Sequence, residues 1–198
     1  MGNVVIDMSM SLDGYIAAPN DNPEQWAGED GMRLHNWAFD DPSLFERVHG
    51  RLVEETGALI MGRRSYDNSI AAWGGKGPPA GRGPRAWWSP TGRPRARTPC
   101  SRSSPTGSKV PSRRPRRSPA TSGSRSWAAE LDQQYLAAGL VDEIRIHLVN
   151  VLLGGGRRLF DQLPRQVELE RTGVTETHGA THLEYRPPVA PSVVGEDA

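Results

Sequence analysis

The sequence predicts one α/β domain whose helices flank a mixed β-sheet. Segments with helical spacing alternate with short apolar strands in the first half of the chain, and two strands patterned as a hairpin come near its end. Outside residues 76–126, Leu, Ile, Val and Phe make up 36 of 147 residues. This quarter exceeds the ~20% level below which a chain fails to build a core, and 198 residues suit a single domain.

The first half is expected to contain two strands with a helix between them. Residues 3–9 hold the apolar run Val-Val-Ile, and Asp13 and Gly14 then form a turn dipeptide. Residues 41–53 start with Asp-Pro, which is typical of an N-cap followed by proline at the first helical position, and continue with apolar residues at helical spacing. Residues 58–61 are a short buried strand that leads directly into a second helix.

The second half is expected to contain a helix, a strand and a hairpin. Residues 129–138 are strong helix formers, and Gly139 stands where a left-handed glycine ends a helix. Residues 142–151 alternate apolar and polar side chains, which predicts a strand with one apolar face. Residues 167–172 and 181–185 are predicted to pair as a hairpin.

The segment of residues 76–126 differs from the rest of the chain. It contains 11 Arg, 2 Lys and 10 of the 17 prolines, but no Asp or Glu and no Leu, Ile, Phe, Met or Tyr. It therefore carries +13, and since the whole chain is at +1, the other 147 residues carry −12. Proline interrupts helices and sheet ladders, so we expect no regular element of useful length here, and predict disorder.

Composition and the N-terminus exclude several classes of protein. The longest apolar runs fall far short of the ~18 residues that a membrane-spanning helix needs. The first ten residues lack the features of a signal peptide, and the single cysteine, Cys100, cannot form an internal disulfide. We therefore expect a cytoplasmic protein without membrane contact.

Two glycine-bearing segments are candidate binding sites. The strand over residues 58–61 ends at a glycine followed by arginines, and free amides at a helix N-terminus together with arginine can bind phosphate. A surface helix start with solvated arginines is the alternative. The second segment, a glycine triplet after a strand, either allows close approach of a flat ligand or is only a turn. The residues are Gly62, Arg63, Arg64 and Ser65 in the first segment and Gly154, Gly155 and Gly156 in the second.

No metal site is expected. His178 and His182 are four residues apart on a predicted hairpin, without an evident third ligand, which is typical of surface histidines. Trp26, Trp37 and Trp73 lie in or beside glycine-bearing loops, where they either cover the edge of the core or line a pocket for an aromatic ring.

Several segments in order resemble the dihydrofolate reductase superfamily, and within it the group of the riboflavin-biosynthesis reductase C-terminal domain. The resemblance covers about residues 1–75 and 129–187. It is carried by Val-Val-Ile-Asp-Met-Ser-Met-Ser-Leu-Asp-Gly-Tyr-Ile-Ala at residues 4–17, Leu-Ile-Met-Gly-Arg-Arg-Ser-Tyr at 59–66, Gly-Leu-Val-Asp-Glu-Ile at 139–144, and Leu-Leu-Gly-Gly-Gly with Leu-Phe at 152–160.

The resemblance implies a mostly parallel central sheet flanked by helices and an NADPH-dependent oxidoreductase that transfers a hydride to a C=O or C=N carbon of a pteridine- or pyrimidine-like molecule. The loop with Ile16 and Ala17 would lie along the nicotinamide, the segment from Gly62 would bind its phosphates, and the glycine triplet would close the pocket. Asp13 is the candidate catalytic residue, as a polar anchor for substrate, and a turn aspartate that caps backbone is the alternative. Relatives of this kind are often homodimers.

The domain is expected to span residues 1–186, interrupted by the aberrant or disordered segment 76–128 and followed by a disordered tail at 187–198. The family has central strands and a Gly-Gly turn where this segment stands. We hypothesise that residues 87–128 are translated in the wrong reading frame. Read one base earlier, Trp-Trp-Ser at 87–89 forces two valines, and Trp-Ala at 127–128 forces a glycine. A genuine insertion is the alternative.

Two rival functions remain. An Arg-rich arm with Trp87 and Trp88 would bind nucleic acid by charge and stacking, although we do not expect nucleic acid as the partner. A catalytically inactive family member is the other. If the segment is out of frame, NADPH binding and activity would be weakened or lost, because Trp127 and alanine replace the glycine backbone that approaches the pyrophosphate.

Overall fold

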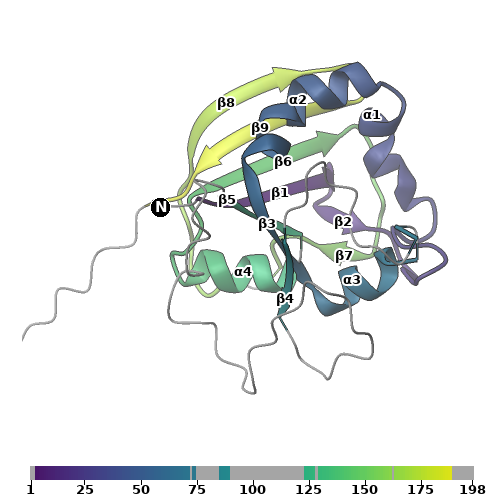
Figure 1. Cartoon of the computed structure of the whole chain (residues 1–198), viewed down its shortest axis with the longest axis horizontal. Coiled ribbons are helices and arrows are strands. Elements are labelled where there is room, and N and C mark those ends of the chain that lie inside the picture. Colours follow the sequence, from purple (N-terminus) through teal and green to yellow (C-terminus); the bar gives the residue numbers. More distant parts are fainter. Residues whose placement is uncertain are drawn as a thin grey trace, which may run out of the picture.

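The computed structural model describes residues 3–71, 73–74, 85–89, 123–127, 129–161 and 163–188 (Figure 1). Its main sheet has seven strands in the order β4-β3-β5-β1-β6-β9-β8. The first five run parallel, and β9 and β8 are antiparallel additions at one edge. This is the mixed, mostly parallel sheet that the sequence predicted.

The strands are β1 (Val4–Ser11), β2 (Tyr15–Ala17), β3 (Thr56–Gly62), β4 (Arg85–Ser89), β5 (Gly123–Trp127), β6 (Glu143–Val149), β7 (Arg157–Arg158), β8 (Glu170–Glu176) and β9 (Ala180–Arg186). The helices are the 3-10 turn η1 (Gly31–His35), α1 (Asn36–Phe39), α2 (Pro42–Glu55), α3 (Arg63–Ser69) and α4 (Ala129–Ala137). A small second sheet pairs β2 with β7.

The predicted helix boundaries in the flanks are confirmed by their capping contacts. Asp41 caps α2, because its Oδ1 accepts hydrogen bonds from the amides of Ser43 at 3.0 Å and Leu44 at 3.1 Å. Gly139 has φ 65° and follows α4, and the Leu140 amide bonds to the carbonyl of Tyr135 at 2.9 Å. Local sequence therefore fixes where both helices start or stop.

The hairpin near the end of the described chain is confirmed, but its first strand was predicted too early. β8 covers residues 170–176 rather than 167–172. The register is set by the turn, where the Thr177 amide bonds to the carbonyl of Ala180 at 3.0 Å and Glu176 pairs with Thr181. Since turn geometry dictates pairing, the apolar pattern of residues 167–172 was the weaker signal.

The prediction that no regular element forms within residues 76–128 is wrong at two places. β4 and β5 both lie in this segment, and β5 pairs with β1 on one side and β3 on the other. Parallel pairing needs only backbone amides and carbonyls, so the proline-free stretches 85–89 and 123–127 can supply it. The remainder of the segment, together with Cys100 and the predicted tail beyond residue 188, lies outside the described residues.

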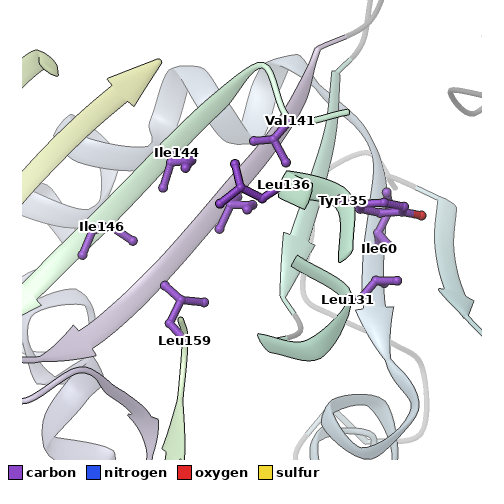
Figure 2. Packing of buried hydrophobic residues seen from close by; sticks show 9 residues of the cluster. Ile60, Leu131, Tyr135, Leu136, Val141, Ile144, Ile146 and Leu159 are labelled. Carbon is purple, nitrogen blue, oxygen red and sulfur yellow. The ribbon is translucent and has the colours of Figure 1, made fainter. Parts of the chain in front are cut away.

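The larger apolar core lies between α4 and one face of the sheet (Figure 2). Leu131, Tyr135 and Leu136 of α4 pack against strand residues that alternate along the chain, including Ile144 and Ile146 of β6. The residues between them point to the opposite face, where η1, α1 and α2 contribute a smaller core around Leu34, Trp37 and Leu44. The cluster on the α4 face is Ile6, Ile60, Leu131, Tyr135, Leu136, Val141, Ile144, Ile146 and Leu159.

Candidate functional site

A cavity of about 750 Å³ lies where three segments of the chain converge. The segments are the loop after β2, one side of α4, and the stretch that follows the glycine triplet. This volume is in the range of small-molecule and cofactor sites. Its lining residues are Ala18, Pro19, Asn20, Asp21, Ala129, Glu130, Gln133, Gln134, Ala137, Gly156, Arg157, Arg158, Asp161 and Pro164.

Asp13 holds the start of the glycine triplet. Its carboxylate accepts hydrogen bonds from the amides of Leu153 at 3.1 Å and Gly154 at 2.7 Å, and from the hydroxyl of Ser11 at 2.6 Å. The Ser11 bond is the largest of the effects that lower the Asp13 pKa from 3.8 to about 2, and the two amides add to it. The carboxylate is thus an ionised hydrogen-bond acceptor for backbone amides. This agrees with the alternative interpretation of Asp13 as a turn aspartate that caps backbone, except that the amides belong to the distant loop at Leu153 and Gly154.

Gly156 brings the triplet against the loop that was expected to lie along the nicotinamide. It has φ +115°, and a Cβ placed on it would stand 2.0 Å from the carbonyl oxygen of Ala17. Gly155 lies close to Pro19, whereas a Cβ on Gly154 would meet open space. Ala17 is buried, and the neighbouring Ile16 packs against the core on the α4 face. The structure therefore brings Gly156 against Ala17, but of the predicted residues in these two segments only Gly156 lines the cavity.

The predicted phosphate-binding segment is placed differently. Gly62 precedes α3, and its backbone is extended with φ −67°. Arg63 pairs with Asp67 at 2.6 Å within that helix, while Arg64 makes a two-pronged ion pair with Asp21, at 2.8 and 2.9 Å. Neither arginine nor Ser65 lines the described cavity, so Arg64 reaches this region only through Asp21.

Asp21 is the main link that sequence reasoning missed. Besides Arg64, it accepts hydrogen bonds from the side chains of Asn68 at 2.9 Å and Arg157 at 3.4 Å. It therefore ties the loop after β2 both to α3 and to the segment after the glycine triplet. The charges of Asp21 and the arginines are visible in the sequence, but Asp21 and Arg64 are 43 positions apart, and no local pattern indicates that they pair.

The cavity has mixed charge. Arg157 and Arg158 face it from the segment after Gly156, and Asp21, Glu130 and Asp161 supply carboxylates. The guanidinium of Arg158 lies 4.5 Å from the ring centre of Tyr15, which holds it by a cation–π contact. On the α4 side, the Gln133 amide donates to the carbonyl of Leu159 at 2.8 Å. Arg157 and Arg158 directly follow the glycine triplet in the sequence, and this position could have identified them as candidate residues of the cavity.

The prediction of ordinary surface histidines is wrong for His182. His178 is exposed in the hairpin turn, but His182 is only 4% exposed and lies on the sheet face opposite α4. Its Nδ1 is 2.7 Å from Nδ1 of His147. Trp37 also lies here, buried, and donates from its indole nitrogen to the Ser9 hydroxyl at 3.1 Å. This group is separate from the cavity.

The sheet order, the glycine triplet against the loop after β2, and the cavity between them and α4 define a dihydrofolate reductase-like α/β fold. Residues 128–183 match the family model of the RibD C-terminal domain. This match includes α4, β6, the glycine triplet, β8 and the first half of β9. It confirms over these residues the resemblance that the sequence motifs indicated.

Solved structures share the fold along nearly the whole chain. One from Shewanella sp. PV-4, described as a riboflavin biosynthesis protein, is 19% identical with a TM-score of 0.61, and the match covers 95% of this chain and 99% of that one. The riboflavin biosynthesis reductase Rib7 of Saccharomyces cerevisiae is 11% identical with a TM-score of 0.55, with 94% and 90% covered.

A third solved structure is longer. It is a diaminohydroxyphosphoribosylaminopyrimidine deaminase/5-amino-6-(5-phosphoribosylamino)uracil reductase of Thermotoga maritima, 13% identical with a TM-score of 0.59. The match covers 94% of this chain but only 57% of that protein. No curated protein matches the sequence. Among the described residues, no helix combines the length and the apolar character needed to cross a bilayer.

Proposed function

We propose that this chain is an NADPH-dependent reductase of the riboflavin-biosynthesis type, which reduces a C=O or C=N carbon of a small pyrimidine- or pteridine-like substrate. The observation that carries the proposal is the 750 Å³ cavity between the loop after β2, α4 and Gly156. Its lining includes Gly156 of the glycine triplet and the loop that directly follows Ile16 and Ala17, which are the two segments that the family resemblance assigned to the cofactor. The match of residues 128–183 to the RibD C-terminal domain supports the same assignment.

The residues around the cavity fit a nicotinamide dinucleotide in size and in part in charge. Arg157 and Arg158 offer cations to phosphate oxygens from one wall, and Ala18, Pro19 and Gly156 add small residues to the lining. Bound there, NADPH would supply the hydride. The chain's own contribution is to position both reactants and to exclude water, for which Asp13 fixes the loop at Gly154.

Asp13 acts in this proposal as a positioning residue rather than as a proton donor. Its pKa of about 2 keeps it ionised near neutral pH, and both of its oxygens accept hydrogen bonds. A carboxylate in this state cannot deliver a proton to substrate. The proton that accompanies the hydride would then come from solvent or from the substrate's surroundings.

The proposed substrate class is supported by the printed descriptions of proteins with a similar fold. The Thermotoga maritima protein is described as a reductase of a phosphoribosylamino-uracil, and two further neighbours as riboflavin biosynthesis proteins. A sugar phosphate on such a pyrimidine would need a cation. Arg64 is engaged with Asp21, so Arg157 and Arg158 are the arginines of the cavity that either phosphate could use, and an effect of Arg158→Ala on NADPH binding would assign Arg158 to the cofactor.

Titration of the full chain with NADPH, followed by quenching of tryptophan fluorescence, tests the proposal. We expect saturable quenching, and about tenfold weaker binding in Arg158→Ala, because a charge-assisted hydrogen bond is worth about 1.5 kcal/mol. Arg171→Ala is the matched control, since Arg171 is an equally exposed arginine on β8 that does not line the cavity. Equal weakening in both variants, or no quenching even in a protein in which the reading frame of residues 87–128 has been corrected, would contradict the assignment.

The same titration separates the rival functions. Binding to single-stranded RNA that falls steeply with salt, with no response to NADPH, would favour the nucleic-acid interpretation. NADPH binding without NADPH oxidation, over a panel of phosphoribosylaminopyrimidines and pterins, would favour an inactive family member. Localisation in the cytoplasm and a homodimer remain predictions, and gel filtration with light scattering tests the second.

We also retain the proposal that residues 87–128 are read out of frame. β5 pairs with strands on both sides, and parallel strands in this position are normally continuous apolar runs. Its sequence is instead Gly-Ser-Arg-Ser-Trp, and the alternative frame converts each TCN-encoded serine to an apolar residue and places a forced glycine directly after the strand.

Sequencing of the coding DNA across codons 73–130 tests this idea directly. We expect two compensating single-base shifts, and a frame-corrected protein that binds NADPH more tightly than the chain as written. Confirmed DNA without such shifts would leave a genuine insertion, and the cofactor proposal would then stand or fall on the quenching titration alone.

A further inference from the structure

Four elements bring buried acidic and imidazole side chains together on the sheet face opposite α4. Asp7 of β1, His49 of α2, His147 of β6 and His182 of β9 are each less than 5% exposed. Nε2 of His49 is 3.0 Å from Oδ1 of Asp7, and Nε2 of His147 is 3.4 Å from the same oxygen. None of the four lines the cavity, so the proposed reductase function does not account for them.

Three of these residues present one ligand atom each to a common point. The ligand atoms of Asp7, His49 and His147 all lie within 4.8 Å of one another. Ligands at bond lengths of 2.0–2.1 Å on a tetrahedral zinc ion are about 3.3 Å apart, so the observed 3.0 and 3.4 Å already approach that spacing. The third pair of ligand atoms, on the two histidines, is no more than 4.8 Å apart, so a small shift of the rings toward each other would let all three bind one ion.

The hydrogen bonds at the hairpin turn indicate which ring nitrogen of a neutral His147 carries the proton. The Thr177 hydroxyl is 2.7 Å from the carbonyl of Ala180 and must donate to it, because a carbonyl only accepts. Nε2 of His182, at 3.1 Å, must then donate to the Thr177 oxygen, which leaves Nδ1 of a neutral His182 as an acceptor. His147 therefore carries its proton on Nδ1 and donates to His182 at 2.7 Å.

This assignment leaves the Nε2 lone pair of a neutral His147 directed at the carboxylate of Asp7. Two acceptors that face each other at 3.4 Å repel, whereas a cation between them attracts both. His182 then has the part that outer partners of metal sites commonly have, because its contact fixes the tautomer and the ring orientation of the ligand.

The surroundings suit a closed structural site. Trp37 lies against His147 with ring centres 4.5 Å apart, and both Trp37 and Phe45 stack on His49, at 5.3 and 4.9 Å. Such an aromatic shell limits access of bulk water and strengthens charge interactions inside it, and one bound water molecule would complete the coordination left open by three protein ligands. Two imidazoles and one carboxylate favour zinc and similar late transition metals over magnesium or calcium.

We propose that Asp7, His49 and His147 bind one divalent transition-metal ion, of the zinc class, which fastens α2 to β1 and β6. His182 is a positioning residue that holds His147 in the tautomer that can coordinate. The site is structural, and it is independent of NADPH binding because it lies outside the cavity.

Cobalt(II) is the probe for the test, since it replaces zinc and its visible bands report coordination. The full chain is treated with a chelator, dialysed and titrated with Co²⁺ alone. We expect one Co²⁺ per chain with the intense visible bands of four- or five-coordinate cobalt, and their loss when Zn²⁺ is added in equal amount. Absence of these bands in the folded wild-type chain would overturn the proposal.

Variants locate the ion. His147→Gln and Asp7→Asn are expected to lose the bands, His182→Gln to weaken binding 10- to 100-fold, and the exposed His178→Gln, as the matched control, to bind like wild type. Bands that persist unchanged in both His147→Gln and Asp7→Asn would place the ion elsewhere and contradict the assignment.

A second measurement covers variants that do not fold. Zn²⁺ should raise the midpoint of thermal unfolding of the wild-type chain, because an ion that binds only the folded state stabilises it. The alternative to a metal ion is an imidazolium at His147. In NMR spectra of the chelator-treated chain it would show protons on both ring nitrogens, and these signals would persist when Zn²⁺ is added. That result, with no shift of the midpoint, would also overturn the proposal.

Discussion

The two faces of the central sheet are built from the same strands but are stabilised in different ways. Along β6, Ile144 and Ile146 enter the apolar core under α4, while the alternate residue His147 joins the polar cluster on the opposite face. The apolar face depends on filled volume, and the opposite face depends on paired hydrogen bonds. Removal of a methyl group should therefore lower the free energy of unfolding most on the face under α4, and removal of a hydroxyl group should lower it most on the opposite face.

Burial makes the pairing on the polar face strict. His182 is 4% exposed, and burial is the main reason that its pKa falls from 6.5 to about 4. Ser9 and Ser11 of β1 are also buried, and each hydroxyl contacts a partner, Trp37 or Asp13. The row of polar residues along β1 thus runs from the histidine cluster to the loop at the cavity.

The largest effect is expected from Ile144→Ala on the apolar face. Ile144 is 1% exposed in the main core, and truncation of a buried isoleucine costs about 2–5 kcal/mol through lost transfer free energy and the cavity left behind. Urea unfolding measures the change. Leu152→Ala is the control, because Leu152 is 68% exposed and should stay within about 0.5 kcal/mol. A similar loss in both variants would break the comparison.

On the polar face, removal of a single hydroxyl group should come next. Ser9→Ala leaves the buried indole N–H of Trp37 without its acceptor, and we expect a loss of about 1–3 kcal/mol by urea unfolding. In the double variant Ser9→Ala/Trp37→Phe no indole donor remains to be orphaned. Its loss should be smaller than the sum of the two single losses, and strict additivity would contradict the importance of this bond.

Ser11→Ala sharpens the comparison at the edge of the cavity. It removes the largest cause of the low Asp13 pKa, so this pKa should rise from about 2 toward 3.8, as measured by NMR titration. In the wild type, a folded pKa below the unfolded value adds stability above pH 3.8 that is lost as the pH falls toward 2. This acid-dependent loss should shrink in Ser11→Ala and vanish in Asp13→Asn. An unchanged pH profile would contradict the bond's role.

The smallest effect is expected from Glu143→Gln. Arg145 and Glu143 form an ion pair on β6 and are both partly exposed, so solvent screens it and the loss should be about 0.2–1 kcal/mol. Measurement of unfolding at low and high salt tests this, because the difference between wild type and variant should decrease with salt. A loss as large as that of Ser9→Ala would show that the partly exposed pair matters as much as the buried ones.

Local signals in the sequence were sufficient for most of the fold. Asp41 with Pro42, Gly139 and the alternation along β6 each depend on neighbouring residues, and each is confirmed. The strand β5 was missed because its side chains give no apolar pattern, while its backbone still pairs with β1 and β3. Strand prediction from side chains fails where the backbone alone supplies the contacts.

The site was only partly predictable for a different reason. The glycine triplet and the loop at Ile16 and Ala17 were identified from motifs, and they meet where Gly156 contacts Ala17, although only Gly156 among these residues lines the cavity. The pairing of Arg64 with Asp21 depends on contacts across 43 residues, as the histidine cluster depends on four separate elements. Such contacts become visible only once the strand order is known.

The contact between Gly156 and the carbonyl of Ala17 has a mechanical consequence. It joins two walls of the cavity backbone to backbone, and the bond from Gln133 to Leu159 fastens the helix wall to the same segment. The walls of the cavity are thus preorganised, so binding of a ligand would cost little conformational entropy of the protein. Ligands of different size would be accommodated by side chains that line the cavity, such as Arg158 and Gln134, rather than by movement of the backbone.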